Sequence, residues 1–151
     1  CIAGDGSIQM NIQELQTLVH HRLPIKIFIL DNGGYSSIRQ TQESFFHRLV
    51  GESPQSGVSF PDMLKIASAY GIPSCKIAGQ DFIGYLEFAL GGEGPFLALV
   101  EMDPRQNFEP KTSSKKLDDG KIVSAPLEDM FPFLEREEYH RNMIGNAKAI
   151  D

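Results

Sequence analysis

Residues 25–30, with the sequence IKIFIL, constrain the fold of this chain more than any other stretch. The run is apolar except for Lys26, and it follows Pro24, which helps to end the helical pattern before it. A near-continuous apolar run of this kind indicates a strand that is buried on both faces. Because such strands are typical of parallel sheets, the run predicts a parallel sheet covered on both sides.

Extended and helical patterns alternate along residues 1–103. Further strands are indicated at residues 1–4, 73–79 and 95–103. Helices are indicated at residues 8–22, 59–71 and 80–92, while residues 37–51 fit either a partial helix or an ordered loop. This order predicts an α/β domain of three α/β/α layers with a mainly parallel sheet.

Capping signals mark the ends of two expected helices. Ser59 fits an N-cap, with Pro61 in the first turn and Asp62 three residues after the cap, and Gly71 ends the same helix. Asp81 lies near the start of the following helix. These residues predict where the segments that cover the sheet begin and end.

A glycine-rich turn, GDGS, follows the first expected strand. Gly4 and Gly6 allow the backbone to turn sharply, so that the amides of Gly6, Ser7 and the helix from Ile8 could face one anion. The carboxylate of Asp5 would repel a phosphate, so a cation must lie between them. Mg²⁺ is a cation that takes oxygen ligands and often bridges to phosphates.

A second polar turn, DNGG, follows the strand at residues 25–30. Ligands bind parallel sheets at the carboxyl ends of their strands, and Asp5 and Asn32 both come just after such ends. The amide oxygen of Asn32 and a carbonyl of the Gly33–Gly34 turn could complete the cation site. Asp-Gly and Asn-Gly are also common in ordinary turns, and each motif alone favours that interpretation. The pair, separated by one helix, favours a metal diphosphate site.

The stretch GDGSIQMNIQELQTLVHHRLPIKIFILDNGGYSSIRQ resembles the thiamine diphosphate-binding signature, and most of all that of acetolactate synthase (acetohydroxyacid synthase) large subunits. The run GDGSIQMNIQELQT, the letters LDN followed by RQ, and the late APLEDM carry the resemblance. It is strongest over residues 1–43 and weaker towards the C-terminus. The resemblance implies the thiamine diphosphate-binding fold.

The resemblance also implies the residues of the site. Asp5, Asn32 and the main-chain oxygen of Gly34 would bind Mg²⁺, as the metal ligands of the family do. Gly6 and Ser7 would contact the diphosphate, helped by main-chain groups near Tyr35, and Gly4 belongs to the same cofactor-binding turn. No catalytic residue is expected here, because the family's activating glutamate comes from another domain, usually of a partner subunit, upstream of Cys1.

The implied reaction is decarboxylation of a 2-keto acid followed by carboligation, as in branched-chain amino acid biosynthesis. The chain begins with Cys1 inside an expected strand, so we expect a C-terminal fragment that is inactive alone and works with the remaining domains of its parent chain. The resemblance implies a homodimer or homotetramer, and it leaves open whether the parent protein also binds FAD.

Two departures from the family affect the expected substrate. Thr41 stands where acetolactate synthases usually carry Trp, and GGYSS replaces the more usual QRLGM. The alternatives are therefore another thiamine diphosphate-dependent 2-keto acid decarboxylase or carboligase, or a non-catalytic assembly module. Arg39 could reach an acid group of a substrate, although an ion pair within the protein is the favoured interpretation.

Composition excludes several other classes of function. A net charge of −6 argues against nucleic acid as a partner, and no apolar run reaches the about 20 residues that span a membrane. No signal peptide is recognisable, and Cys1 and Cys75 have no metal-site spacing. The absence of a disulfide framework favours a reducing cytoplasm.

The composition changes after Asp103, and residues 104–151 are expected to form a separate, solvated tail. Phe131, Phe133 and Leu134 are expected to anchor its far end, and residues 134–144 to form a short terminal helix. The sequence thus divides into a cofactor-binding α/β domain at residues 1–103 and a C-terminal tail at residues 104–151.

Overall fold

The computed structural model describes residues 1–79, 82–106 and 109–143. The chain divides into two compact units, Cys1–Gln106 and Asn107–Asp151. Asp81, expected near a helix start, and Ile144, at the end of the expected terminal helix, lie outside the described residues. None of the described helices is long and apolar enough to cross a membrane.

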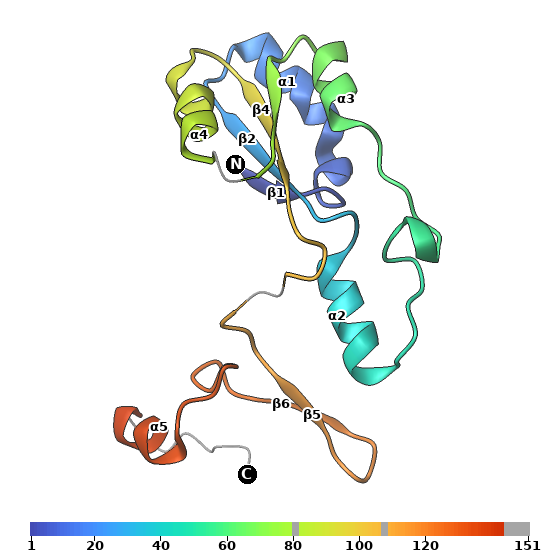
Figure 1. The fold of residues 1–151 in the computed structure, drawn as a ribbon, viewed down its shortest axis with the longest axis vertical. Coiled ribbons are helices and arrows are strands. Elements are labelled where there is room, and N and C mark those ends of the chain that lie inside the picture. The colour runs from blue at the N-terminus through green and yellow to red at the C-terminus, as the bar shows by residue number, and fades with distance from the viewer. Residues whose placement is uncertain (80–81, 107–108, 144–151) are drawn as a thin grey trace. The chain divides into compact units, whose positions relative to one another are not determined.

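The first unit is built on a four-stranded sheet in the order β1-β2-β4-β3, in which every neighbouring pair is parallel (Figure 1). Its strands are β1 (Ile2–Gly4), β2 (Lys26–Asp31), β3 (Ser74–Ile77) and β4 (Phe96–Glu101). The expected α/β domain with a parallel sheet is confirmed. The most central pair, β2 with β4, runs in register from Lys26 opposite Phe96 to Asp31 opposite Glu101.

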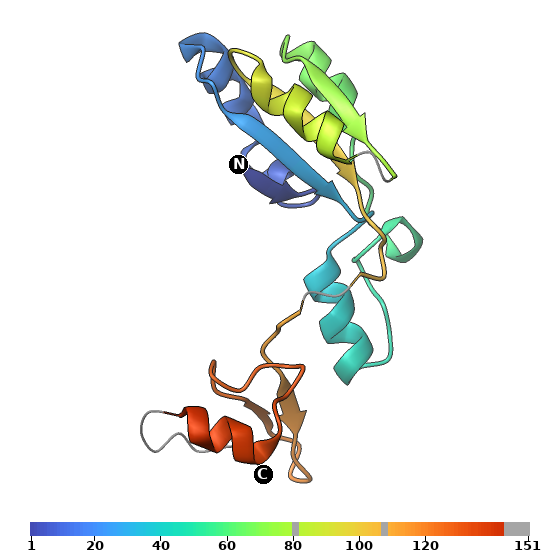
Figure 2. The same cartoon turned by 60° about the vertical axis from the view of Figure 1, so that its left-hand side comes forward.

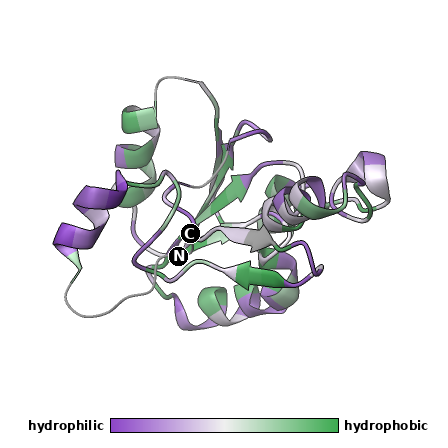
Figure 3. Ribbon diagram, turned by 90° about the horizontal axis from the view of Figure 1, so that it is seen from below, coloured by the Kyte–Doolittle hydropathy of each residue, from purple (hydrophilic) through white to green (hydrophobic). Residues whose placement is uncertain are grey.

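Helical segments cover both faces of this sheet, which gives three layers (Figure 2). One face is covered by the 3-10 helix η1 (Ile8–Glu14), α1 (Leu15–His21) and α3 (Met63–Ala69), and the other by α4 (Phe82–Gly91). Strand β2 sends Ile27 and Ile29 into the first layer and Phe28 and Leu30 into the second. This alternation explains why the sequence of β2 is apolar at nearly every position. Much of the sheet is green, the colour of hydrophobic residues, in Figure 3.

Lys26 interrupts the apolar run because it begins β2 at the amino edge of the sheet. Its ammonium group donates to the carbonyl oxygens of Gly92 and Gly94, at 2.6 and 2.7 Å. The charge therefore lies on a connecting loop and not inside a hydrophobic layer.

The helix expected at residues 8–22 is instead two segments. Residues Ile8–Glu14 form 3-10 helix, and the α-helix begins only at Leu15. Asn11 departs from helical geometry, with φ −132° and ψ 30°. The side chain of asparagine can form hydrogen bonds to nearby backbone groups in non-helical conformations. Asparagine is therefore unfavourable inside an α-helix. The helix ends as expected before Pro24, with Arg22 in the left-handed region at φ 51°.

The segment that the sequence leaves undecided, residues 37–51, contains most of a helix, α2 (Ser36–Phe45), and a short 3-10 turn, η2 (Pro54–Ser56), follows it. The expected N-cap at Ser59 is wrong. Helix α3 is capped by Asp62, whose carboxylate accepts from the amides of Leu64 and Lys65 at 3.1 and 3.2 Å. Carboxylates are as good at this position as hydroxyls, and the helix starts after Pro61 and not around it.

The second unit contains a small antiparallel hairpin, β5 (Ser114–Lys116) and β6 (Ile122–Ser124), and helix α5 (Arg136–Asn142). The expected anchor is wrong, because Phe131, Phe133 and Leu134 are 39%, 50% and 48% exposed. The described residues that are buried here are Asp129 and Tyr139.

Candidate functional site

The two polar turns meet at the carboxyl edge of the sheet. Asp5 directly follows β1 and Asn32 directly follows β2, as the sequence predicts. The buried carboxylate of Asp5 accepts from its neighbour Gly6 at 2.8 Å and from the amide of Gly34 at 2.9 Å. One side chain therefore joins the GDG turn to the DNGG turn across 29 residues of sequence.

The electrostatics around Asp5 favour a cation. Burial raises the pKa of its carboxyl group most, and the neighbouring Asp31 raises it further, while the amides of Gly6 and Gly34 act in the opposite direction. The net result is a pKa above the ordinary value of 3.8. A cation beside this group would favour the charged form and offset the cost of burying it.

Asn32 carries an unsatisfied acceptor. Its side-chain oxygen, Oδ1, is buried and has no hydrogen-bond partner among the described residues. Buried polar atoms are nearly always paired, so this oxygen is available to a ligand or to a water molecule. An amide oxygen is a suitable ligand for a hard divalent cation.

Gly33 and Gly34 of the DNGG turn both resist replacement, Gly33 because of its backbone angle and Gly34 because of its close neighbours. Gly33 has φ +65°, in the region that favours glycine. A Cβ on Gly34 would lie 2.2 Å from the carbonyl oxygen of Glu52 and 2.7 Å from Nη2 of Arg39. The turn is thus packed directly against another loop of the protein.

The GDG turn is covered by Tyr35. A Cβ on Gly6 would lie 2.2 Å from the ring of Tyr35, which makes an edge contact with Phe60 at 5.4 Å between centroids. Gly4 ends β1, and Ser7 is exposed at the start of η1. The amide of Gly6, expected to face an anion, is used by Asp5. The residues predicted from the sequence therefore lie together at the carboxyl edge of the sheet. The amide of Gly6, however, donates to the Asp5 carboxylate.

Two hollows flank the DNGG turn. One of about 320 Å³ is lined by Asp5 and Asp31, with Phe60, Asp62 and Leu99 among its other walls. A second of about 510 Å³ is lined by Asn32, Arg39 and Glu52, with Pro104 and Arg105 on its far side. Gly33 lines both. Asp5 and Asn32 therefore line adjacent hollows that share Gly33 and Pro54.

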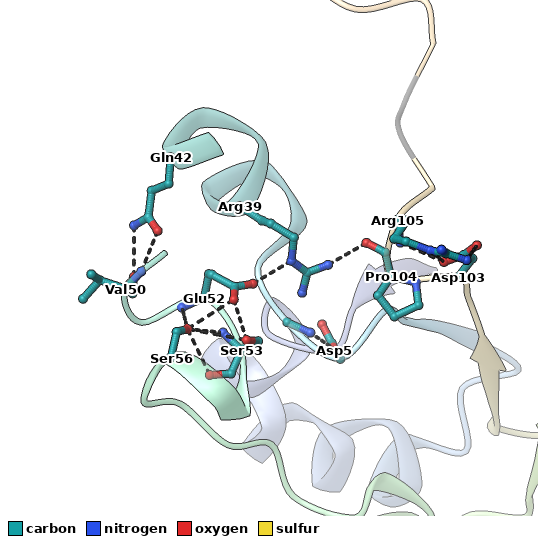
Figure 4. A network of polar contacts seen from close by, with 11 residues as sticks. Asp5, Arg39, Gln42, Val50, Glu52, Ser53, Ser56, Asp103, Pro104 and Arg105 are labelled. Atoms are coloured by element: carbon teal, nitrogen blue, oxygen red, sulfur yellow. Dashed lines mark hydrogen bonds and ion pairs between the residues drawn. The ribbon is translucent and has the colours of Figure 1, made fainter. Parts of the chain in front are cut away.

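A polar network that the sequence did not reveal adjoins this turn (Figure 4). Glu52 is only 2% exposed, and Nε of Arg39 donates to its carboxylate at 2.6 Å. Burial alone would raise the pKa of Glu52, but hydrogen bonds from Ser53 and Arg39 outweigh it and leave the pKa below its ordinary value. The favoured interpretation of Arg39 as an ion-pair residue is confirmed.

Glu52 escaped sequence reasoning because a single glutamate in a polar loop resembles a solvated residue. The available signal was the sequence Ser53–Ser56, which forms a capping box around η2. The hydroxyl of Ser56 accepts from the amides of both Glu52 and Ser53, at 2.8 and 2.9 Å. This local structure turns the glutamate side chain inward.

The described residues contain no group of three or more His, Cys, Asp or Glu side chains that could hold a metal ion. A cation at this edge would instead use one carboxylate together with neutral oxygens. Such a donor set fits Mg²⁺, which is commonly held by one or two carboxylates plus ligand phosphates and water. Cys1 and Cys75, both free thiols, are not among the residues that line the two hollows.

Residues 1–100 match the family described as "Thiamine pyrophosphate enzyme, C-terminal TPP binding domain". The large subunit of acetolactate synthase isozyme 2 from Escherichia coli is 40% identical over 111 residues, which cover 73% of this chain and 20% of the relative. The acetolactate synthase large subunit of Pyropia yezoensis is 34% identical over 117 residues, covering 77% of this chain and 20% of the relative.

A solved structure supports the same fold. The thiamine diphosphate-dependent 4-hydroxybenzoylformate decarboxylase of Rhodococcus jostii RHA1 is 28% identical, with a TM-score of 0.56. The match covers 70% of this chain and 19% of that one. This chain spans about a fifth of the length of the acetolactate synthase subunits that it matches. The family match contains both polar turns, Asp5 and Asn32 included.

Proposed function

This chain belongs to the thiamine pyrophosphate enzyme family, as a C-terminal TPP binding domain, and from that premise we propose that it anchors thiamine diphosphate through Mg²⁺ in an acetolactate synthase-like enzyme. The observation that carries the proposal is the buried, unpartnered side-chain oxygen of Asn32. It lies two residues from Gly34, whose amide is bonded to the buried carboxylate of Asp5.

In this proposal three oxygens of the chain hold the metal: a carboxylate oxygen of Asp5, Oδ1 of Asn32 and the main-chain oxygen of Gly34. The amides of Gly6 and Gly34 fix the orientation of the Asp5 carboxylate, and each of its oxygens keeps a lone pair for a cation. The exposed Ser7 would contact the diphosphate, together with backbone groups of the turn from Gly4 to Gly6.

Thiamine diphosphate, when bound, supplies the electron sink for decarboxylation and carboligation of 2-keto acids. The residues of this chain bind and orient it. Asp5 supplies negative charge opposite the metal, and the ring of Tyr35 covers the backbone of Gly6. The glutamate that activates the cofactor lies outside this chain in the proposal, so the chain contributes the anchor and not the proton transfer.

A second candidate function keeps the cofactor and ends the reaction at decarboxylation. The similarity to a solved 4-hydroxybenzoylformate decarboxylase favours it. So does the exposed Thr41 on α2, which stands where acetolactate synthases usually carry an aromatic residue.

Cofactor binding tests the proposal on the intact protein. We expect calorimetric titration with thiamine diphosphate to show binding with Mg²⁺ and none with excess EDTA. Asp5→Ala should weaken binding by at least about 100-fold, beyond the loss expected from an outer-shell partner. If the wild-type protein does not bind thiamine diphosphate in the presence of Mg²⁺, the proposal is wrong.

Asp62→Ala is the matched control, because Asp62 lines the same hollow as Asp5 but caps α3. It should cost about 1 kcal/mol of stability and leave the Mg²⁺ requirement unchanged. The products then separate the two functions. Acetolactate formed from pyruvate, followed by NMR, supports the synthase, whereas free acetaldehyde supports the decarboxylase.

A further inference from the structure

We propose that Arg39 is a positioning residue of the cation site, and that its ion pair with Glu52 holds the turn at residues 32–34 in the shape that binds Mg²⁺. The inference rests on the proposed function above. It assigns to Arg39 and Glu52 no contact with metal, cofactor or substrate. Both act through the backbone that carries Asn32 and Gly34.

The backbone of Glu52 touches the turn directly. Its carbonyl oxygen accepts from the amide of Tyr35 at 2.8 Å. The same oxygen occupies the space beside Gly34 where any other residue would place a Cβ. Because the amide of Tyr35 and the carbonyl of Gly34 belong to one planar peptide group, a shift of Glu52 must move the Gly34 carbonyl as well.

The side-chain contacts of Glu52 hold its own backbone carbonyl in place. One carboxylate oxygen accepts from Nε of Arg39 at 2.6 Å, and the other accepts from the hydroxyls of Ser53 and Ser56. With the side chain 2% exposed, rotation into water would break this whole set of contacts. Glu52 is thus held at both ends, by its carboxylate and by its backbone.

Arg39 connects this loop to two other segments. It belongs to the first turn of α2, where its amide donates to the carbonyl of Tyr35 at 2.9 Å. Its Nη1 donates to the carbonyl of Pro104 at 2.6 Å, just beyond β4. Its Nη2 lies 2.7 Å from the position of a Cβ on Gly34, so the guanidinium lies over the turn itself. Figure 4 shows Arg39 between the Glu52 loop and Pro104.

A buried ion pair of this kind contributes more to the geometry of the segments it joins than to the stability of the fold. Removing two charges from water costs so much that a buried ion pair often adds little net stability over an apolar pair of similar size. A guanidinium with several fixed donor directions does, however, hold its partners at defined angles. Arg39 uses two of these directions on two different segments, which fixes the turn between them.

The test is a Mg²⁺ titration of the intact protein at saturating thiamine diphosphate, with cofactor binding followed by calorimetry and unfolding followed in parallel. For Arg39→Met we expect the Mg²⁺ concentration at half-saturation to rise by about tenfold, the scale of a lost outer-shell contact. Arg39→Lys should fall between Met and wild type, because lysine keeps the charge but lacks the second donor direction.

Gln42→Ala is the matched control. Gln42 lies on the same helix and binds the same loop, with hydrogen bonds of 3.0 and 2.8 Å to the backbone of Val50. Those contacts lie away from the turn, so this variant should lower the melting temperature without moving the Mg²⁺ midpoint. Equal shifts of the Mg²⁺ midpoint in Arg39→Met and Gln42→Ala would overturn the inference, since they would reflect stability alone.

Glu52→Gln tests the same pair from its other side and serves if Arg39→Met does not fold. Because the two residues act as one unit, the double variant should bind Mg²⁺ no more weakly than the weaker single variant. Wild-type Mg²⁺ binding in both single variants would overturn the inference. Failure of the wild-type protein to bind thiamine diphosphate would instead remove the proposed function itself.

Discussion

Two arginine–carboxylate pairs, one in each unit of the chain, are alike in distance and burial but differ in their contacts. Arg39 pairs with Glu52 at 2.6 Å, and Arg136 pairs with Asp129 at 2.8 Å. In both, the acid is almost fully buried, with 2% and 4% of its side chain exposed. Burial and distance alone would therefore assign them the same role.

The geometry of the contacts separates the two pairs. Two nitrogens of Arg136 donate to the carboxylate of Asp129, at 2.8 and 2.9 Å. The same guanidinium lies 5.6 Å from the ring centre of Phe133 and 5.0 Å from that of Tyr139. All of these partners belong to residues 129–139. Arg39 gives one nitrogen to Glu52 and another to Pro104, 65 residues further along the chain. We call the Arg136 pair closed, because its partners lie within one short segment, and the Arg39 pair open, because it joins segments that are far apart in the sequence.

Gly34→Ala tests this contrast most strongly, because we expect it to have the largest effect on cofactor binding. The new methyl group would meet the Glu52 carbonyl at 2.2 Å and Arg39 at 2.7 Å, so the open pair and the turn must separate. We expect loss of Mg²⁺-dependent cofactor binding in calorimetry and a stability loss of about 2 kcal/mol in denaturant unfolding. Gly92→Ala, where a Cβ meets nothing within 4 Å, should change neither quantity.

A smaller effect, confined to the second unit, is expected from Asp129→Asn. Loss of the charge-assisted, two-nitrogen contact should destabilise α5 by about 2 kcal/mol, measured as faster hydrogen exchange of its amides. The Mg²⁺ midpoint of cofactor binding should stay at the wild-type value. A shifted midpoint would show that the closed pair also serves the site, and the contrast between the pairs would fail.

The smallest effect is expected from acid. Hydrogen bonds from Arg136 lower the pKa of Asp129 below its ordinary value of 3.8, against the opposing effect of burial. A lowered pKa in the folded state means that the contribution to stability is complete above the ordinary value and is lost as the pH falls through the folded value. Protection of α5 amides should therefore fall only below about pH 3.8. In Asp129→Asn this step should be missing, and an identical acid response of both proteins would assign it to another group.

The sequence was informative where a residue's surroundings are set by its neighbours in the chain. The apolar run of β2 predicted a strand covered on both faces, and the structure sends Ile27 and Phe28 into opposite layers. The turns after β1 and β2 predicted that Asp5 and the DNGG turn would meet, and the Gly34 amide does bind the Asp5 carboxylate. The roles of these residues in metal and diphosphate binding stay predictions.

Sequence reasoning failed where distant contacts decide. Glu52 was not singled out from the sequence, because the arginine that it pairs with lies 13 residues earlier in the chain. Phe131 and Phe133 looked like an anchor because they are aromatic, but they lie partly exposed, and Arg136 and Lys111 lie over their faces. One failure is local: residues Ile8–Glu14 form 3-10 helix, and the non-helical Asn11 interrupts an otherwise good helical pattern.

The contact between Arg39 and the carbonyl of Pro104 also has a consequence for how the protein reaches its native state. Pro104 follows β4, which takes its place between β2 and β3 in the sheet. The contact therefore requires the chain to close a loop of 65 residues. Pairings so distant in sequence form slowly, because the entropy of loop closure is lost before the contacts are gained. If the proposed cation site depends on this contact, we expect it to form late in folding, so that Mg²⁺ stabilises the folded protein and does not nucleate it.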